Sequence, residues 1–283
     1  MRLRNAAPLV LALALASPVA ARATGNADVA ALQVGLEARD LYGDDVDGYV
    51  GPHTLAGLRR LRGASTLFAP ATRAALGDYG AHVLGSRPLV KGTFGWDVSA
   101  LQFLLAWHGF SSGRFDGDFG PRTRAALLRF QRWAGIDPIA VAGPRTLAAL
   151  RQPPPACPLG FSAPIRALPT DGFGPRGTEF HTGIDFPAPA GAPVLAARDG
   201  VVDAAGWLAG YGRVVVLRHE QEVTTLYAHL SRILVDPGMP VARGAVIGLV
   251  GQTGNASGPH LHFEARVRGA AVDPAPTLSS WEG

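Results

Sequence analysis

Three short motifs in the C-terminal half of the chain concentrate side chains that can bind a metal ion. They contain four of the eight histidines and one suitably spaced carboxylate: His181, Asp185, His229, His260 and His262. Residues two apart in a β-strand point to the same face, so a strand through His260 and His262 would place both imidazoles side by side. Two adjacent imidazoles are unfavourable if both are protonated, but they suit a site in which one or both bind a metal ion.

The types of donor favour zinc. Two histidines and one carboxylate with an open fourth position are typical of a catalytic zinc ion, and His181 and Asp185 can add donors to the His260 and His262 pair. Calcium and magnesium prefer oxygen-only sites. The sequence contains one cysteine, Cys157, which excludes a thiolate zinc finger. We therefore expect one Zn²⁺ in this part of the chain. A lone cysteine in an exported protein can pair between chains, but Cys157 follows a proline-rich segment, and we expect an unreactive thiol there.

The residues from about 159 onward predict an antiparallel β domain that would carry these motifs. Gly and Pro separate short runs of β-branched and apolar residues, and no helix of ten residues fits. The expected strands cover residues 213–218, 222–227, 245–250 and 261–267, and the first two form a hairpin. In the last strand, Leu261 and Phe263 would face the core on the side opposite the histidines.

The N-terminal half contains two copies of one pattern. Residues 28–33 and 47–54 recur at a shift of 69 residues, and residues 70–76 recur at a shift of 74. A shared shift between separate motifs indicates a duplicated domain. Each copy predicts a small helical unit, because Asp-Gly marks a turn and Gly-Pro-x-Thr starts a helix with proline at its first position.

The second copy contains Phe115-Asp116-Gly117, Gly120-Pro121-Arg122-Thr123 and Phe130-Gln131. With these motifs it resembles the peptidoglycan-binding domain of bacterial cell-wall hydrolases, a three-helix module. The first copy is degenerate, with Arg59-Arg60-Leu61-Arg62 at the last of these positions. The resemblance implies peptidoglycan as the partner, with Asp116, Gly117, Phe119 and Arg122 as candidate substrate contacts. The other interpretation is that both copies are structural helix-turn motifs without a ligand.

Three motifs of the β domain together resemble the lysostaphin and LytM family of zinc endopeptidases. They are His181-x-x-x-Asp185, Tyr227-Ala228-His229 and Gly258-Pro259-His260-Leu261-His262-Phe263-Glu264, with Phe173-Gly174-Pro175-Arg176 ahead of them. The resemblance covers about residues 165–275. It implies an antiparallel β fold with the metal at the floor of a narrow groove, where His181, Asp185 and His262 hold the zinc ion. Asn255 precedes the last motif, in a loop that departs slightly from the family, and is a further candidate substrate contact.

The same resemblance implies that the two remaining histidines, His229 and His260, are catalytic. A neutral His260 beside His262 can accept a proton from water, and His229 can donate to the oxyanion formed at the scissile carbonyl. The sequence contains no His-Glu-x-x-His motif, so the glutamate base of helical metalloproteases is absent. Glu264 shares the strand face of His260 and His262, and we expect a supporting or strand-surface carboxylate there.

The first residues predict a secretory signal peptide. Arg2 and Arg4 precede an apolar run over residues 6–16, and Ala21-Arg22-Ala23 has the small-x-small form of a cleavage site. The expected organisation is a signal peptide (1–23), a degenerate repeat (24–88), a second repeat (89–151), a proline-rich linker (152–158) and a peptidase domain (159–283). The predicted fold class is two small three-helix repeats followed by a mainly antiparallel β domain with a groove.

Composition and charge limit the partners. With 47% hydrophobic and 17% charged residues, the chain is neither disordered nor collagen-like. The net charge of +4 falls to +1 without the three arginines of the predicted signal peptide, so nucleic acid is not an expected partner. No later segment is apolar enough for a membrane helix. We expect an exported monomer that acts in the cell envelope or outside the cell.

The expected function is a secreted zinc endopeptidase that cuts the peptide cross-links of peptidoglycan and is held on the wall by its repeats. One alternative is a catalytically inactive relative that binds the wall or activates another hydrolase. A second is a non-haem iron oxygenase, whose usual His-x-Asp spacing differs from that of His181 and Asp185. Residues 172–177 match a dinucleotide-binding glycine pattern but follow no predicted strand, so we reject that function.

Overall fold

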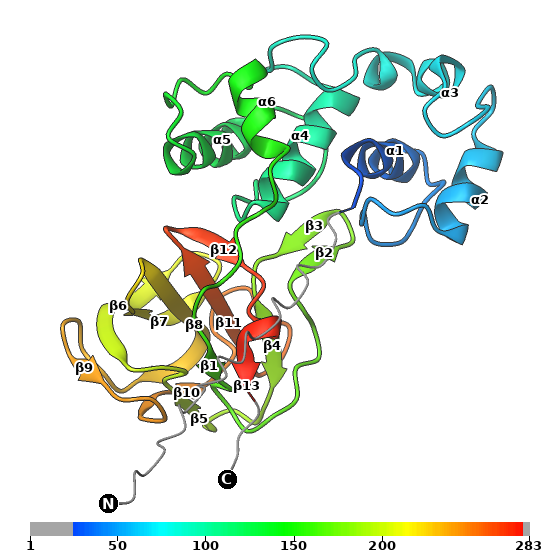
Figure 1. The fold of residues 1–283 in the computed structure, drawn as a ribbon. Helices are drawn as coiled ribbons and strands as arrows, with labels where there is room; N and C mark the ends of the chain where they lie inside the picture. The colour runs from blue at the N-terminus through cyan, green and yellow to red at the C-terminus, as the bar shows by residue number, and fades with distance from the viewer. Residues whose placement is uncertain (1–24, 280–283) are drawn as a thin grey trace, which may run out of the picture.

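The computed structural model describes residues 25–279, and the expected signal peptide (1–23) lies outside the described residues. Within that range, six α-helices precede the first strand, and a β domain follows them (Figure 1). A large and a small apolar core lie inside the β domain, and two others lie in the helical region and include a few residues of the β domain. The described chain is thus a helical region followed by a mainly antiparallel β domain.

The helical region consists of short helices, most of which start at a proline. Its helices are α1 (Ala27–Glu37), α2 (Pro52–Arg60), α3 (Pro70–Ala75), η1 (Gly77–Gly80), α4 (Trp96–Trp107), α5 (Pro121–Trp133) and α6 (Pro144–Leu150). Proline occupies the first turn of α2, α3, α5 and α6, where its missing N–H would have had no helical partner. None of the helices in residues 25–279 is long and apolar enough to cross a membrane.

Two buried glutamines at equivalent positions hold the loops that precede α2 and α5. Gln102 in α4 donates from Nε2 to Asp116 Oδ1 (2.8 Å) and to Thr123 Oγ1 (3.1 Å), and its Oε1 accepts from the N–H of Gly117 (3.0 Å). The corresponding residues of the first copy make the same bonds: Gln33 with Asp47, Thr54 and Gly48. The glycine of each network has a φ of +73°, a conformation that glycine adopts without strain. The repeated sequence therefore builds the same polar network twice.

The β domain is built around a nine-stranded sheet whose paired strands are antiparallel. In this sheet β12, β11, β8, β7, β6 and β9 are adjacent in that order, β4 pairs with β11, and β10 pairs with β8 and β5. The bounds are β1 Phe161–Ser162, β2 Gly174–Arg176, β3 Glu179–His181, β4 Ile184–Pro187, β5 Pro193–Leu195, β6 Gly200–Leu208, β7 Gly212–Arg218, β8 Val223–Ile233, β9 Pro240–Val241, β10 Val246–Val250, β11 His260–Val267, β12 Ala270–Val272, η2 Ala275–Thr277 and β13 Leu278–Ser279. The pair β2–β3 forms a separate hairpin, and β1 pairs with β13 in parallel.

The four predicted strands are confirmed as parts of β7, β8, β10 and β11, and β7 pairs with β8 as expected. Leu261 and Phe263 in β11 have no exposed surface and belong to the core of the β domain. Because side chains alternate along a strand, His260 and His262 lie on the opposite face. Burial of one face of β11 therefore directs the other face toward the candidate site.

The segment between the two parts, residues 152–158, has no regular secondary structure. Cys157 near its end is half-buried, and its Sγ contacts the carbonyl oxygen of Leu159 at 3.5 Å. Burial raises the pKa of the Cys157 thiol, which disfavours the nucleophilic thiolate. This agrees with the unreactive thiol that we expected.

The polar network of the second copy predicts a stability change. Gln102→Ala should lower the free energy of unfolding by about 2–4 kcal/mol, because it leaves a cavity and buried N–H groups without acceptors. Chemical denaturation followed by tryptophan fluorescence measures the change. Arg124→Ala, on the exposed side of α5, is the control and should change stability by less than about 0.5 kcal/mol. If the two variants were equally stable, the network would not be what holds this loop.

Candidate metal centre

Strand register brings two of the predicted metal-binding residues face to face. β4 and β11 are antiparallel neighbours, and Asp185 lies directly opposite His262, so both side chains point to the same side of the sheet. His181 ends β3, and the chain turns into β4 through Gly183. A Cβ atom on Gly183 would lie 2.4 Å from the carbonyl oxygen of Phe263, so the turn can lie against β11 because this residue is glycine.

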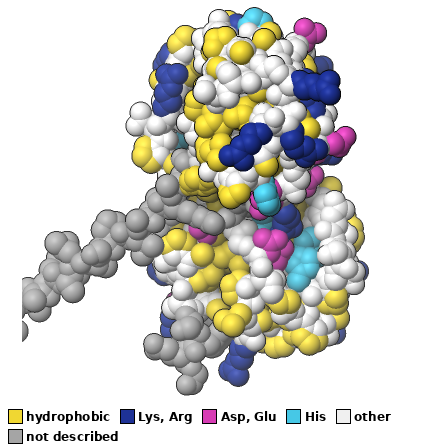
Figure 2. All heavy atoms as spheres, turned by 90° about the vertical axis from the view of Figure 1, so that its right-hand side faces the viewer, with side chains coloured by type: hydrophobic (Ala, Val, Ile, Leu, Met, Phe, Trp, Pro, Cys, Tyr) yellow, Lys and Arg dark blue, Asp and Glu magenta, His cyan; other side chains and the backbone are white. Residues whose placement is uncertain are grey.

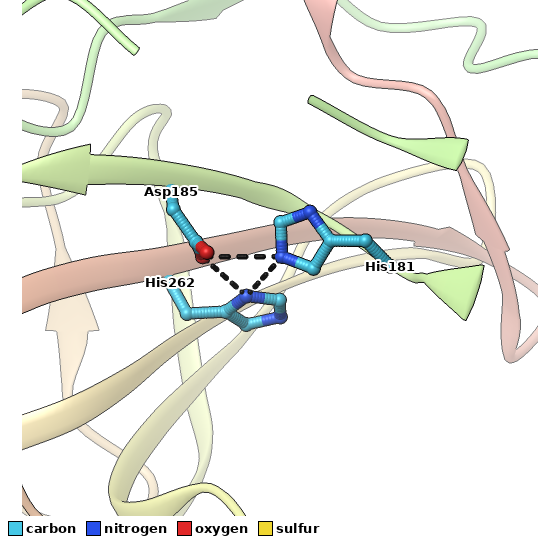
Figure 3. Close-up of side chains that lie close together, drawn as sticks. All are labelled: His181, Asp185 and His262. Carbon is cyan, nitrogen blue, oxygen red and sulfur yellow. Dashed lines mark hydrogen bonds and ion pairs between the residues drawn. The ribbon is translucent and has the colours of Figure 1, made fainter. Parts of the chain in front are cut away.

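The three predicted donor atoms converge on one point (Figure 3). His181 Nε2 lies 3.1 Å from Asp185 Oδ1 and 3.0 Å from His262 Nδ1, and the last two atoms are 2.9 Å apart. Ligands of a tetrahedral zinc ion with bonds of about 2.0–2.1 Å lie roughly 3.3 Å from each other, close to the sides of this triangle. The side chains are 7%, 14% and 7% exposed, so the cluster is largely shielded from water.

Hydrogen bonds on the far side of each ring decide which nitrogen faces the cluster. His181 Nδ1–H donates to the carbonyl oxygen of Gly172 (2.7 Å), which leaves a lone pair on Nε2. His262 Nε2–H donates to the carboxylate of Glu264 (3.0 Å), which leaves a lone pair on Nδ1. With Asp185 Oδ1, three electron-rich atoms therefore meet at one point. This arrangement fits a cation, and the donor set fits Zn²⁺.

The carboxylates around the cluster stabilise positive charge on its nitrogens. Burial alone would lower the pKa of His262, but hydrogen bonds to Asp185 and Glu264 outweigh burial and raise this pKa to about 9. Burial favours a protonated Asp185, yet its hydrogen bonds to His181 and His262 hold the pKa of that carboxyl well below its usual range. The cluster thus attracts cations, and a proton competes with a metal ion for His262.

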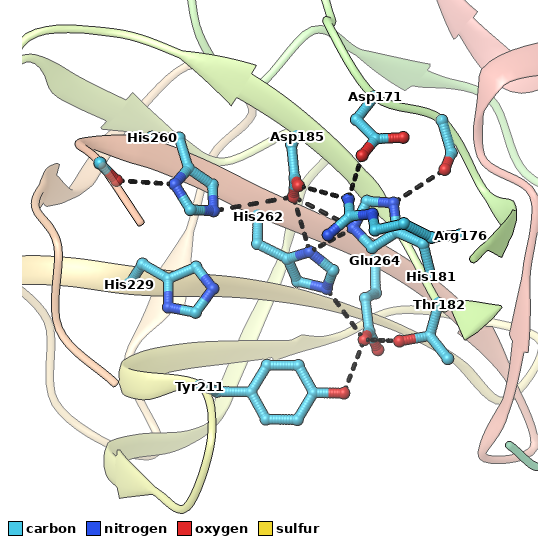
Figure 4. Close-up of polar contacts among 12 residues, drawn as sticks. Asp171, Arg176, His181, Thr182, Asp185, Tyr211, His229, His260, His262 and Glu264 are labelled. Atoms are coloured by element: carbon cyan, nitrogen blue, oxygen red, sulfur yellow. Dashed lines mark hydrogen bonds and ion pairs between the residues drawn. The ribbon is translucent and has the colours of Figure 1, made fainter. Parts of the chain in front are cut away.

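A buried carboxylate, Glu264, supports the cluster from β11 (Figure 4). Besides the His262 ring, it accepts from Thr182 Oγ1 (2.6 Å), Tyr211 OH (2.8 Å) and Arg266 Nε (2.6 Å). Burial raises the pKa of Glu264, but Arg266 and His262 hold it well below its usual range, so Glu264 stays ionised. Its supporting role was expected from the strand pattern. Sequence reasoning missed Tyr211 and Arg266, although Arg266 continues the same strand face two residues further on.

The two remaining predicted histidines lie beside the cluster rather than in it. His260 Nε2 is 3.8 Å from Asp185 Oδ1, and the ring of His229 lies 4.7 Å from the ring of His260, centre to centre. His229 has a φ of +59°, which is rare for a residue other than glycine. At this point β8 bulges, because two of its residues lie opposite one residue of β7. The bulge turns His229 toward the site, and sequence reasoning did not anticipate it.

Both of these rings present the same kind of nitrogen to the site. His260 Nδ1–H donates to the carbonyl oxygen of Gly258 (2.9 Å), and His229 Nδ1–H donates to that of Thr253 (2.7 Å). Nε2 of each neutral ring therefore carries a lone pair. Burial lowers the pKa of His229, and the neighbouring histidines lower it further, which favours the neutral ring. Each neutral ring can thus accept a proton at Nε2, and the donor role expected for His229 requires that this ring first gain a proton.

The five side chains line one pocket of about 380 Å³. The β2–β3 hairpin contributes one wall, and the loop before β11 contributes Asn255 and Ser257. Figure 2 shows histidine side chains gathered on one face of the β domain, beside acidic side chains and below the helical region. Asn255, one of the candidate substrate contacts, is therefore next to the cluster.

The other four candidate substrate contacts lie in the helical region, outside this pocket. Asp116 and Gly117 bond to Gln102 and shape the turn before α5. Phe119 has no exposed surface and packs in the core of the helical region. The prediction that Phe119 contacts substrate is therefore wrong, because a fully buried ring stabilises the fold and is not accessible to a ligand. Arg122 is exposed at the start of α5 and stays a candidate.

Comparison with known families finds a match in each part of the chain. Residues 179–274 match "Peptidase family M23", and residues 95–150 match the family described as "Putative peptidoglycan binding domain". The chain therefore carries an M23 peptidase domain of the LytM type, preceded by a peptidoglycan-binding domain. This confirms the resemblance stated from the sequence motifs.

The M23 domain is similar to enzymes from several bacteria. DD-carboxypeptidase/endopeptidase Mpg of Neisseria meningitidis is 53% identical over 94 residues, which are 33% of this chain and 22% of that protein. Peptidoglycan DD-endopeptidase ShyA of Vibrio cholerae is 47% identical over 93 residues, again 33% of this chain and 22% of that protein. The catalytic domain of the antimicrobial peptidase lysostaphin from Staphylococcus simulans is 33% identical, covers 39% of this chain and 90% of that domain, and has a TM-score of 0.37. The chain spans about a fifth of the length of the two curated relatives.

The charge on His262 predicts a pH-dependent affinity for zinc. The affinity should rise by up to about tenfold per pH unit between about pH 6.5 and 8.5, because His262 must lose a proton of pKa about 9 before Nδ1 can bind a metal. Competition with a chromophoric chelator of known protonation measures the apparent Kd at each pH.

The matched variant is Glu264→Gln. It keeps an oxygen that accepts from His262 Nε2 but removes the charge that raises the pKa of His262, so its affinity should depend less on pH. If the affinity of the unmodified chain stayed constant over this pH range, the role assigned to His262 Nδ1 would be wrong.

Proposed function

We propose that the chain is a zinc endopeptidase that hydrolyses the peptide cross-links of peptidoglycan. One observation carries the proposal: His181, Asp185 and His262 aim three lone pairs at one point, and the Nε2 atoms of His229 and His260 lie in the same pocket. The M23 match and the names of the similar enzymes support the reaction class. The match of residues 95–150 supports peptidoglycan as the substrate.

The five side chains divide into two groups in this proposal. His181 Nε2, Asp185 Oδ1 and His262 Nδ1 hold one Zn²⁺, which when bound acidifies water and polarises the scissile carbonyl. His260 accepts the proton of the attacking water at Nε2, because this nitrogen lies 3.8 Å from the cluster oxygen of Asp185. His229, once protonated at Nε2, donates to the oxyanion. The proton held by His260 then passes to the leaving amine.

We also propose a division of the chain into segments. Two related helical repeats (24–88 and 89–151) and a linker (152–158) precede the peptidase domain (159–283), and a signal peptide (1–23) directs export. The equivalent networks of Gln33 and Gln102 support the duplication. The mature chain is a monomer that binds peptidoglycan in the cell envelope or outside the cell, with its substrate lying in a groove across the pocket.

Single histidine variants separate metal binding from proton transfer. His260→Ala should keep near-stoichiometric zinc and lose hydrolysis by at least about 100-fold, because it removes the proton acceptor and no metal donor. His181→Ala and Asp185→Ala should lose the metal itself. Metal analysis of the purified chains, together with mass spectrometry of muropeptides released from isolated walls, measures both properties. His53→Ala, an exposed histidine of the helical region, is the control and should behave as wild type.

Two outcomes would contradict this assignment. Equal loss of zinc in all three variants would show that the roles of His260 and the cluster residues are wrongly divided. A wild-type chain that binds zinc but releases no muropeptides would instead be the inactive wall-binding relative.

A further inference from the structure

The β2–β3 hairpin projects toward the helical region, which forms hydrogen bonds with the hairpin turn (Figure 1). The N–H of Val46 donates to the carbonyl oxygen of Gly177 (2.9 Å), and the N–H of Gly177 donates to Asp45 Oδ1 (2.6 Å). The N–H of Phe115 donates to the carbonyl oxygen of Thr178 (2.6 Å). Loops from both helical copies therefore hold the two residues of the hairpin turn.

Aromatic side chains hold the base of the same hairpin. Phe173, just before β2, and Phe180, in β3, are almost fully buried and pack into an apolar core of the helical region. Trp107, the last residue of α4, contacts both rings edge to face, at 6.3 Å and 5.3 Å between ring centres. Without the helical region, Phe173 and Phe180 would lose the apolar core that covers them.

The hairpin carries side chains of the proposed active site. His181 ends β3, and Arg176 ends β2, where its guanidinium pairs with Asp171 and with Asp185 Oδ2 (2.8 Å). The carbonyl oxygen that orients the His181 ring belongs to Gly172, in the segment leading into β2. A shift of the hairpin would therefore move one metal donor and loosen another.

The hairpin has little stability of its own. β2 and β3 pair through three residue pairs and form a sheet separate from the nine-stranded one. A two-stranded hairpin is marginal in water unless it packs against another element. For β2–β3 the described packing partner of Phe173 and Phe180 is the helical region.

We propose that the helical region positions the active site, with Trp107 and Asp45 as positioning residues, in addition to any binding of the wall. The inference rests on the proposed function, because metal binding and catalysis at His181 are the properties that it explains. The helical region then affects the hydrolysis even of a small peptide substrate that does not contact it. This differs from the sequence-based expectation, in which the repeats act by holding the enzyme on its substrate.

A second contact between the two parts avoids the hairpin and provides a control. Trp133, at the end of α5, donates from Nε1 to the carbonyl oxygen of Val267 (3.3 Å), and the guanidinium of Arg268 lies 4.8 Å from its ring centre. Val267 is the last residue of β11 and Arg268 follows it, at the end of the strand remote from His260 and His262. Loss of Trp133 removes a tryptophan from the contact between the two parts without touching the hairpin.

The test uses the full chain and measures the zinc Kd, and kcat and KM for a small soluble peptide substrate. Trp107→Ala should weaken zinc binding by about tenfold or more and lower kcat by a similar factor, with a smaller change in KM. Trp107→Phe should restore both, because Trp107 Nε1 has no hydrogen-bond partner in the part of the chain that the structure describes, and phenylalanine keeps the ring contacts. Trp133→Ala should stay within about twofold of wild type.

Two variants of exposed residues test the contact between the helical region and the hairpin turn without altering the core. Asp45→Ala removes the acceptor of the Gly177 N–H and should weaken zinc binding about threefold or more. Asp137→Ala changes an exposed aspartate in the loop after α5, away from the hairpin, and should leave zinc binding unchanged. Because Asp45 is exposed, this variant tests the proposal even if Trp107→Ala fails to fold.

The possible failures are distinguishable. If Trp107→Ala and Asp45→Ala matched Trp133→Ala and Asp137→Ala in zinc Kd and kcat, the positioning role would be overturned. If the wild-type chain neither bound zinc nor cleaved the peptide, the proposed function would fail instead.

Discussion

The rest of the site depends on one constraint: His181 Nε2, Asp185 Oδ1 and His262 Nδ1 are held about 3 Å from one another with their lone pairs directed at one point. Contacts on the far side of each group prevent it from turning away. His181 is fixed by the carbonyl oxygen of Gly172, and His262 by the carboxylate of Glu264. Asp185 is fixed by its register opposite His262 and by Arg176. A cation relieves the mutual repulsion of such atoms, so the fold that holds them together fits a metal ion.

Residues around the three donor atoms hold them in place, first by direct hydrogen bonds and then through more distant packing. Glu264 is buried and ionised, and Thr182, Tyr211 and Arg266 satisfy its oxygens, so the ring of His262 has one favourable orientation. The bulge in β8 brings His229 to the same side as His260. Beyond these groups, the helical region packs against the hairpin that ends at His181. The two halves of the chain therefore meet at the element on which the first donor depends.

Much of this arrangement follows from local sequence. The period-two spacing of His260, His262 and Glu264 places them on one face of β11, because their neighbours Leu261 and Phe263 require the core. Proline at the first turn of four helices marks where those helices begin. The duplicated pattern in the N-terminal half corresponds to a duplicated hydrogen-bond network, because the same polar side chains recur at the same spacing.

Other features could not be predicted, because they depend on contacts between segments far apart in the chain. The left-handed conformation of His229 follows from the pairing of β8 with β7, which no local pattern encodes. The hydrogen bonds of Gly177 to Asp45 and Val46 join residues more than 130 positions apart. Phe119 was expected to touch substrate because it lies in a motif, whereas packing places it in the core. Motif spacing reports which residues recur, and burial decides which of them reach the surface.

The central claim is tested most directly by diffraction from crystals of the full chain grown with zinc, with data collected on both sides of the zinc absorption edge. We predict one strong anomalous peak within bonding distance, about 2 Å, of His181 Nε2, Asp185 Oδ1 and His262 Nδ1. The account would be contradicted by a site that holds no anomalous peak while zinc binds elsewhere, or by a peak coordinated through His229 and His260 instead.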